Sequence, residues 1–356
     1  MDEVNRMFSG NTVDTTRIWG DHAISVMINA LQMAYPGFPK STVPWRPNAL
    51  VIAPIQAFQF AFTSSSLVHH PNNAPVILVP EKLTEDLSKE IFRLSPAGKD
   101  VEAQTFLIGP VSEIVEHQLK AMGLTTLRIG NARPYETSVS VSEYRLAHSP
   151  MSGQGRKNVF LLSGEVYAEG MAAVGYAMHE GLPVLLSKRM EIPHEVQRFL
   201  IEHPTLNVFI VGSEASISRE VEAQIRAKMK GSVIRISGLS PYEISVNFSY
   251  FFDPHTGVGW GRNQPGKGDA FSSVPANDWQ LGVISGLFSH LGKHAPLLLI
   301  DRNKIPQVVQ NYLRYLNPVK KSSQPPYMHA FVFGNFDSIS YETQVHLEEQ
   351  IILQEH

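Results

Sequence analysis

The sequence predicts an α/β protein in which three similar parallel-sheet units pack as a pseudo-threefold trimer. Two observations predict this fold. Three short segments recur in the same order about every 110 residues, and within each period short apolar runs alternate with helical patterns. A fixed period of this kind marks a repeat architecture, because each copy is one structural unit. The expected units are residues 1–121, 122–229 and 230–356.

The first recurring segment begins with an arginine. RIGNARPYETSV starts at Arg128 and RISGLSPYEISV at Arg235, and the two agree at seven of twelve positions without a gap. RIWGDHAISV, which starts at Arg17, is a shorter version. The three arginines are 111 and 107 residues apart, and this spacing sets the period of the repeat.

Two further segments recur in step with the first. A proline-led apolar run occurs as NAPVILV, GLPVLLS and HAPLLLI, in which Pro75, Pro183 and Pro296 are 108 and 113 residues apart. An apolar run that ends in glycine occurs as TFLIGPVS, VFIVGSEASIS and AFVFGNFDSIS. Three segments in the same order at the same period indicate three copies of one unit.

The second unit shows the order of elements most clearly. Short apolar runs bounded by turn residues are typical of buried parallel strands, and the amphipathic stretches between them are typical of helices that cover a sheet. Strands are expected at 158–163, 183–187, 206–212 and 232–236, and helices at 168–180, 194–203 and 219–229. This alternation predicts a parallel sheet with helices on both faces, as in flavodoxin-like and Rossmann-like folds.

The composition describes a soluble globular chain and argues against several function classes. Of the 356 residues, 43% are hydrophobic and 18% charged, and a net charge of −3 gives no general field for binding nucleic acid. With no cysteine, the chain forms no disulfides, thiolate metal sites, iron–sulfur clusters or thiol nucleophiles. No apolar run approaches the ~20 residues that a membrane-spanning helix needs.

The order of the recurring segments resembles the type 2 cell-wall-binding repeat. The second unit carries the resemblance best, in RIGNARPYETSV, LLSGEVYAEGMAA, GLPVLLS and VFIVGSEASIS. The first unit departs from the pattern because RIWGDHAISV lacks the Tyr-Glu pair, and the third has AFSSVPANDWQLG in place of the Ser-Gly segment. The resemblance covers roughly residues 12–345. It implies three tandem α/β repeats in a pseudo-trimer that binds anionic wall polymers without a covalent link.

The recurring arginines are the main candidates for polymer binding. Arg17, Arg128 and Arg235 each end an expected strand, where α/β sheets commonly present ligands. A guanidinium recognises phosphate or carboxylate through paired donors, and three weak sites together give avidity for a charged polymer. The alternative is that each arginine pairs with the glutamate of its own segment, Glu136 or Glu243, and only holds the repeats together.

Two tyrosines of the same segments are also candidates. Tyr135 and Tyr242 occupy the same position of the PYE triplet in the second and third units. They are expected either to pack at the interface between repeats or to offer a surface on which a sugar ring stacks.

The segment DPHTGVGWGRNQPGKGDAF contains a near match to a phosphate-binding loop. Its last position is Gly268 in place of Ser or Thr, and an expected strand follows it where a nucleotide loop needs a helix. Residues 253–268 are therefore expected to form an exposed loop of the third repeat, because glycine and proline at this density supply turns. Its tip is expected to present Trp260, Arg262 and Lys267 to an anionic glycan or to a neighbouring subunit.

No catalytic, cofactor or metal site is expected. His70, His179 and His290 each precede the proline-led strand of their unit, which favours a capping or packing role over metal binding. The sequence has no nucleophile elbow. The carboxylates Glu165 and Glu169 have no counterparts in the other units, and a glycosidase needs two carboxylates in a set geometry.

The expected function is that of a non-enzymatic bacterial surface protein. It would bind an anionic cell-wall polysaccharide or teichoic-type polymer through arginine-lined crevices between repeats. The start MDEVNRMFSGNT lacks the basic-then-apolar order of a secretory signal, so the chain is either cytoplasmic or exported with its signal already removed; the latter is expected. Two functions remain as alternatives: a subunit that assembles with copies of itself into a surface layer or filament, indicated by NFSYFF (247–252), and an α/β enzyme acting on a phosphorylated or sugar ligand.

Overall fold

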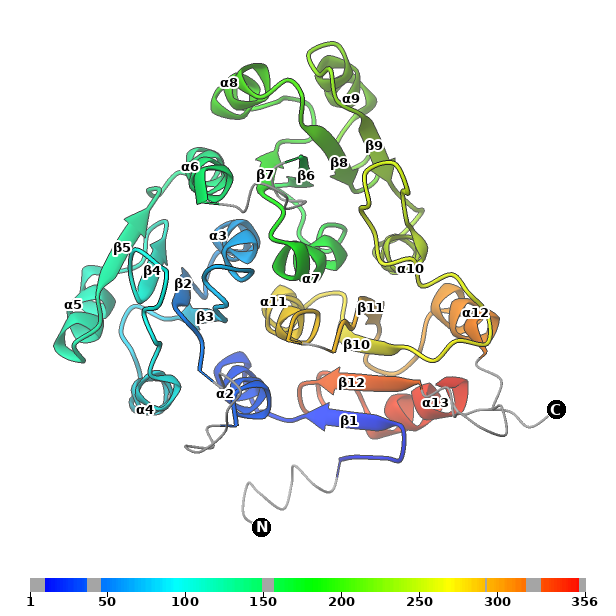
Figure 1. Cartoon of the computed structure of the whole chain (residues 1–356). Coiled ribbons are helices and arrows are strands. Elements are labelled where there is room, and N and C mark those ends of the chain that lie inside the picture. Colours follow the sequence, from blue (N-terminus) through cyan, green and yellow to red (C-terminus); the bar gives the residue numbers. More distant parts are fainter. Residues whose placement is uncertain (1–9, 37–45, 149–156, 292, 318–327, 352–356) are drawn as a thin grey trace.

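The computed structural model describes residues 10–36, 46–148, 157–291, 293–317 and 328–351. Three four-stranded sheets lie in this part of the chain, and all their strand pairs are parallel. Figure 1 shows them on three sides of a triangular molecule. The predicted α/β fold of three parallel-sheet repeats is confirmed. The polar residues 1–9, on which the expectation about a secretion signal depends, lie outside the described residues.

The second sheet has the strand order β7-β6-β8-β9 and follows the predicted elements closely. Its strands are β6 (Asn158–Ser163), β7 (Val184–Ser187), β8 (Asn207–Val211) and β9 (Val233–Ile236), with helices α7 (Met171–Glu180), α8 (His194–Glu202) and α9 (Arg219–Arg226). All six residues of β6 are buried. Val159 and Leu161 belong to the cluster packed by α8 and α9, whereas Phe160 and Leu162 belong to the central core. Burial on both faces explains why the strand is apolar throughout.

The first sheet repeats this arrangement in the order β3-β2-β4-β5. Its strands are β2 (Leu50–Pro54), β3 (Val76–Val79), β4 (Thr105–Ile108) and β5 (Thr126–Ile129). Its helices are α3 (Phe58–Ser64), continued by the 3₁₀ turn η1 (Ser65–Leu67), α4 (Glu85–Leu94) and α5 (Glu113–Ala121). Thr84 and Ser112 cap α4 and α5 by accepting a backbone N–H, which fixes where these outer helices begin.

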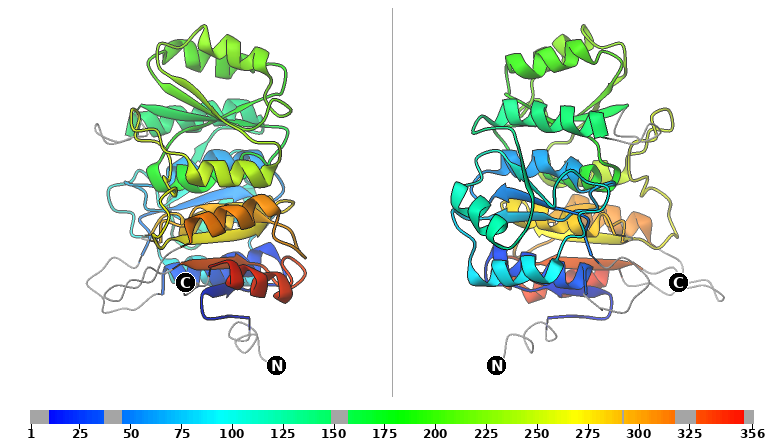
Figure 2. Two further views of the ribbon diagram at one scale, coloured as in Figure 1. Left: turned by 90° about the vertical axis from the view of Figure 1, so that its right-hand side faces the viewer. Right: turned by 60° about the vertical axis from the view of Figure 1, so that its left-hand side comes forward.

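The third sheet, β1-β12-β10-β11, takes its edge strand from the other end of the chain. Its elements are β1 (Thr15–Ile18), β10 (Ala270–Pro275), β11 (Leu297–Ile300), β12 (His329–Phe333), α11 (Trp279–Ser285), η3 (Gly286–Phe288), α12 (Gln307–Leu316) and α13 (Tyr341–Ile351). β1 pairs with β12 in a register that sets Arg17 beside Val332. Figure 2 shows the two strands together at one end of the molecule. The first strand of the chain thus completes the last sheet.

Strands β1, β5 and β9 carry the recurring arginines. Each belongs to one sequence repeat but pairs with the sheet of the repeat before it, and β1 of the first repeat pairs with the sheet of the third. A linking helix then leads into the next unit: α2 (Ala23–Ala34), α6 (Pro134–His148) and α10 (Pro241–Tyr250). α6 packs against β7 and α10 against β11. Each sheet therefore ends in a strand from the following sequence repeat, and the predicted boundaries at 121 and 229 divide the sequence rather than the sheets. We call the three places where such a strand passes into its linking helix the joints.

A ring of hydrogen bonds between units supports the pseudo-threefold arrangement. Near the carboxyl ends of the central strands, one side chain of each unit donates to a backbone carbonyl of the next. The bonds are Gln59 Nε2 to Gly164 O (3.0 Å), Tyr167 Oη to Asn277 O (3.1 Å) and Gln280 Nε2 to Ile55 O (2.8 Å). The first unit contacts the second, the second the third and the third the first, so the contacts close on themselves.

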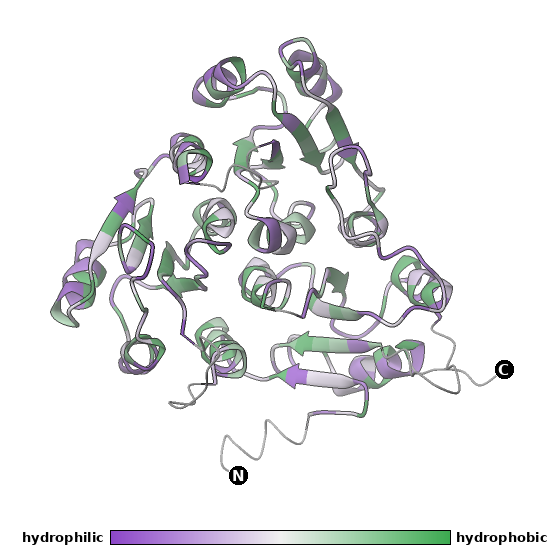
Figure 3. Ribbon diagram, viewed as in Figure 1, coloured by the Kyte–Doolittle hydropathy of each residue, from purple (hydrophilic) through white to green (hydrophobic). Residues whose placement is uncertain are grey.

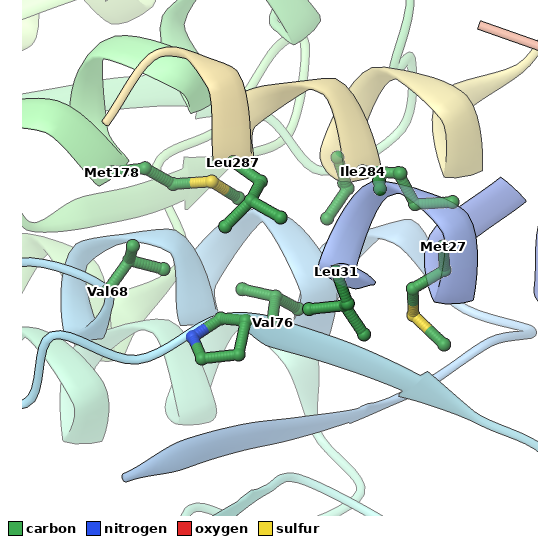
Figure 4. Close-up of a pocket in the computed structure, with 10 residues that line it drawn as sticks. Met27, Leu31, Val68, Val76, Met178, Ile284 and Leu287 are labelled. Atoms are coloured by element: carbon green, nitrogen blue, oxygen red, sulfur yellow. The ribbon is translucent and has the colours of Figure 1, made fainter. Parts of the chain in front are cut away.

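The centre of the molecule is tightly packed. A Cβ at Gly286 would lie 2.4 Å from Met178 Sδ, so a larger residue there would require Met178 to shift between η3 and α7. Figure 4 shows a cavity whose lining comes from all three units, including Leu31, Met178 and Leu287. Its volume is about 10 Å³, at the lower limit for a single water. The axis is therefore part of the hydrophobic core and offers no ligand pocket there.

The distribution of hydropathy agrees with this packing. Figure 3 shows apolar strands inside each unit and polar residues on the outward faces of the outer helices. In the parts of the chain that the structure describes, no helix has both the length and the apolar character required to cross a bilayer.

Candidate functional site

Arg17, Arg128 and Arg235 occupy equivalent places in the three joints and make one shared contact. In each case Nη1 donates to the carbonyl of the glycine that ends the neighbouring strand. The bonds are Arg17 to Gly334 (3.0 Å), Arg128 to Gly109 (3.1 Å) and Arg235 to Gly212 (2.9 Å). These glycines end the third recurring segment and have φ of 98°, 66° and 148°, a conformation that other residues rarely adopt. Two of the recurring segments are therefore partners in one contact.

At two joints the arginine also pairs with a carboxylate of the outer helix. Arg128 Nη2 lies 2.7 Å from Glu116 on α5, and Arg235 Nε lies 2.6 Å from Glu222 on α9. Hydrogen bonds from Lys120 and Arg128 lower the pKa of Glu116 to about 2. Burial raises the pKa of Glu222, but bonds from Arg235 and Arg226 outweigh it and the net shift is downward. Both pairs are ionised at neutral pH.

The alternative in which each arginine pairs with the glutamate of its own segment is wrong. Glu136 accepts instead from Arg133 Nη1 at 2.6 Å, and Glu243 accepts from the backbone N–H of Leu239 at 2.7 Å. The cause is topological. The arginine lies on a strand of one sheet, whereas its own glutamate begins the linking helix, which packs on the next sheet.

The joint formed by β1 and α2, which we call the closing joint, lacks the carboxylate. The position of Glu116 and Glu222 is taken by Gln344 on α13, whose Oε1 accepts from Arg17 Nε at 2.7 Å. Arg17 Nη1 also donates to Asn335 O at 3.0 Å, and Nη2 is buried without a hydrogen-bond partner. Among the described residues Arg17 has no ion-pair partner, although it is only 2% exposed. Burial lowers the pKa of Arg17 to about 10, so the guanidinium stays charged at neutral pH.

A pocket of about 320 Å³ opens at the closing joint. It lies between the edge strand β1 and helix α2 and is lined by Asn11, Thr16, Arg17, Ile18, Asn29, Gln32 and Met33. Its volume is in the usual range for sites that hold small ligands or a short piece of polymer. Three amides and a hydroxyl line the pocket and can bind a hydroxyl-bearing ligand. The guanidinium of Arg17 is buried beside the pocket, with Nε bonded to Gln344 on α13, and its unneutralised charge favours an anionic group there.

The two candidate tyrosines lie at the other joints and hold the linking helices in place. Tyr135 on α6 packs against Gly164, where a Cβ would meet its ring at 2.6 Å. Tyr242 on α10 donates its hydroxyl to Asp301, just beyond β11. Burial, followed by Asp301, raises the pKa of Tyr242 to about 12. These contacts favour interface packing for both residues, and sugar stacking stays a prediction.

The glycine-rich loop departs from its expected form. Lys267 is exposed and the strand β10 follows it, which confirms that no nucleotide-binding helix begins there. The prediction that Trp260 is an exposed tip residue is wrong: its ring stacks on His179 at a centroid distance of 5.1 Å and packs edge-on against Tyr176. Arg262 is held by Asp269 at 2.8 Å. The loop folds back on the core because its aromatic residue finds an apolar surface on α7.

The recurring histidines converge near the axis. The ring of His290 lies 5.4 Å from that of His69 and 6.4 Å from that of His179, measured between centroids. His69, rather than the predicted His70, belongs to this cluster, and His294 joins it 4.7 Å from His179. No three His, Cys, Asp or Glu residues in the described ranges are placed to hold a metal ion. The histidines pack against one another at the ends of the central helices.

Sequence reasoning missed the residues that complete the closing joint. Asn11, Asn29 and Gln32 line the pocket through a strand–helix pairing that no local pattern reveals. Gln344 could have been found, because ISYETQ aligns with ISREVE and VSEIVE and replaces their final glutamate.

Comparison with known proteins agrees with the predicted family. Residues 128–222 match the model of the Cell wall binding domain 2 family. Two solved structures of Clostridium difficile proteins share the fold, each with a TM-score of 0.72. Cwp6 is 15% identical and Cwp8 17% identical; the alignments cover 93% and 99% of this chain but 48% and 54% of those proteins.

Two curated relatives from Bacillus subtilis (strain 168) match over part of their length. The amidase enhancer is 26% identical over 213 residues, and N-acetylmuramoyl-L-alanine amidase LytC is 24% identical over 185 residues. The alignments span 58% and 52% of this chain but only 26% and 34% of those relatives. Residues 128–222 therefore match the cell wall binding domain 2 family, and the chain as a whole has the fold of Cwp6 and Cwp8.

Proposed function

We propose that this chain is a non-catalytic, cell-surface module that binds an anionic cell-wall polymer non-covalently, with the closing joint as its principal contact. The family match supports association with the cell wall. The names of the two curated relatives, an amidase and an amidase enhancer, place related sequence in proteins connected with wall chemistry. Under this proposal the chain lies outside the cell, at the wall.

The observation that carries the proposal is the unneutralised charge of Arg17. Charged side chains are almost never fully buried without a partner, because removing an ion from water is costly. Arg128 and Arg235 follow this rule through Glu116 and Glu222, whereas Arg17 contacts only neutral groups among the described residues. An anionic group held in the neighbouring pocket would supply the missing charge.

The other two joints extend the contact along a polymer. The side chain of Arg128 is 34% exposed and that of Arg235 12% exposed, so each can add a weak interaction to the charge it already meets. Weak sites spaced around one rigid body raise the affinity for a ligand of repeated charge, because later contacts form at high effective concentration. A teichoic-type polyphosphate or an acidic polysaccharide meets these requirements.

The alternative of self-assembly through NFSYFF receives less support. Phe248 in this segment is 1% exposed and packs in the core, which leaves Tyr250 and Phe252 as its exposed rings. The segment thus offers a small apolar surface in place of the continuous one that a filament interface needs.

Binding of purified teichoic polymer across a salt series tests the proposal. We expect retention of the polymer at low ionic strength and a decline as salt screens the charges. Arg17→Gln should weaken binding at least about tenfold, since a charge-assisted contact is lost. The matched control is Arg198→Gln on α8, whose side chain is 62% exposed and which lies on the second sheet, whereas the closing joint lies on the third. Equal binding by wild type and Arg17→Gln would contradict the proposal.

A further inference from the structure

Three aromatic side chains gather beside the closing joint. Trp19 follows β1, Phe336 lies in the loop after β12, and Tyr341 is the first residue of α13. The rings of Trp19 and Phe336 meet edge-on with centroids 4.8 Å apart, and those of Phe336 and Tyr341 meet at 5.7 Å. Phe336 is 37% and Tyr341 46% exposed, while Trp19 is half-buried. We call this group the aromatic platform.

The platform is specific to this sheet. At the same positions of the second sheet the chain has Ser237, Glu214 and Arg219. The last two form an ion pair at 2.5 Å, where the third sheet has the contact between Phe336 and Tyr341. The second sheet thus forms with a polar ion pair at these positions, so the fold does not require aromatic residues there. The exposed rings of Phe336 and Tyr341 therefore point to a contact with a molecule outside the chain.

The platform adjoins the pocket at the closing joint. The guanidinium carbon of Arg17 lies 4.8 Å from the centre of the Phe336 ring, and Arg17 also lines the pocket. The backbone carbonyl of Trp19 accepts from Asn29 Nδ2 at 2.8 Å, and Asn29 is a second pocket residue. A chain molecule that occupies the pocket would therefore lie next to the aromatic rings.

We propose that the aromatic platform stacks the pyranose rings of a wall glycan whose anionic group lies in the pocket beside Arg17. This inference rests on the proposed function and names the sugar as the second element that the site recognises. The C–H face of a pyranose is apolar and matches the negative face of an aromatic ring, while its hydroxyls stay free for polar neighbours. The ion pair of Arg302 with Asp337, 2.8 Å long and next to Phe336, supplies such polar groups at the rim.

The test uses a neutral probe that separates stacking from charge. Tri-N-acetylchitotriose, an uncharged trimer of N-acetylglucosamine, is titrated into the full chain by calorimetry and by saturation-transfer NMR. We expect binding that is insensitive to salt and about tenfold weaker in Tyr341→Ala, with recovery in Tyr341→Phe, which keeps the ring. Phe92→Ala on α4, which removes a ring that is 79% exposed elsewhere on the surface, serves as the control and should bind like wild type.

The outcomes distinguish this inference from the proposed function. Binding of the trimer without salt-dependent binding of teichoic polymer would support the platform and overturn the anionic-polymer function. Polymer binding that Tyr341→Ala leaves unchanged, together with no binding of the trimer, would overturn the platform and leave the function standing. If Tyr341→Ala and Phe92→Ala weaken trimer binding equally, the platform is also overturned.

Discussion

The closing joint and the joint at Arg235 share the bond from arginine to glycine but differ in whether the arginine charge is neutralised. Arg235 and Arg17 both donate to the glycine at the end of the neighbouring strand, at 2.9 and 3.0 Å. Arg235 then meets Glu222, whereas Arg17 meets the neutral Gln344. The difference teaches that one position in a repeat can serve structure in one copy and ligand binding in another, through a single change from carboxylate to amide.

The largest effect on stability is expected at the joint that is fully paired. Arg235→Ala leaves Glu222 partly buried with only Arg226 to pair it and frees the carbonyl of Gly212, so we expect a loss of about 2–3 kcal/mol in the free energy of unfolding. Arg128→Ala should cost less, because its side chain is 34% exposed and better screened. Urea denaturation measures both. If the two variants lose equal stability, exposure does not distinguish these joints.

A second prediction concerns the glycine-rich loop, residues 253–268. Trp260→Ala removes a ring packed on His179 and Tyr176, and we expect a loss of about 2 kcal/mol, below the range for a fully buried tryptophan because this one is half-buried. Lys267→Ala in the same loop is exposed and should change stability by less than about 0.5 kcal/mol. Thermal unfolding of the two variants checks this. A stable Trp260→Ala variant would restore the loop as a free contact surface.

A third prediction concerns how the free energy of unfolding depends on pH, first through the histidines near the axis and then through the joints. Burial and neighbouring positive groups lower the pKa of His69 and His290 to about 4 and that of His179 to about 3, with Arg145 near His69 and Arg262 near His179. These groups are neutral in the fold but bind protons below pH 6.5 when unfolded. Stability is therefore full above pH 6.5 and falls as the pH drops toward 4, by at most about 1.4 kcal/mol per pH unit for each histidine.

The joints should respond to acid later than the axis. The pKa of Glu116 is lowered to about 2, so the ion pair with Arg128 contributes stability above the ordinary pKa of glutamate and loses it only as the pH falls toward 2. The free energy of unfolding, measured from pH 7 to 4 in wild type and in His290→Gln, tests the role given to the histidines near the axis. We expect this free energy to fall less steeply with decreasing pH in the variant, and an equal dependence on pH would contradict that role.

Much of the fold was predictable because repetition makes long-range order visible in the sequence. The three recurring segments contain three of the four strands of each sheet, and Arg17, Arg128 and Arg235 share the hydrogen bond to a strand-ending glycine. The pairing of β1 with β12 was not predictable, since the partner of an edge strand depends on tertiary contacts about 315 residues away. This crossing between units is also why the predicted glutamate partners of the arginines were wrong.

The site was less predictable than the fold because it depends on which residues differ between copies. The PYE triplet recurs in two units and made its tyrosines candidate binding residues, yet the contacts of Tyr135 and Tyr242 are explained by packing of the linking helices. The informative positions are the departures: Gln344 in place of glutamate, and Phe336 with Tyr341 in place of an ion pair. The prediction that Trp260 is exposed was wrong because a turn-rich segment can still pack its one aromatic residue against a neighbouring helix.

One substitution tests the central claim most directly. Gln344→Glu gives the closing joint the carboxylate that the other two joints have, and so neutralises Arg17 from within. The account predicts that salt-sensitive binding of purified teichoic polymer falls at least about tenfold. Because Gln344 Nε2 donates to Gly10 O and to Thr15 Oγ1, bonds that a carboxylate cannot donate, urea denaturation must show that the variant is folded under the binding conditions. Gln350→Glu adds the same charge on the same helix α13, away from Arg17, and should bind like wild type. Undiminished polymer binding by Gln344→Glu would contradict the account.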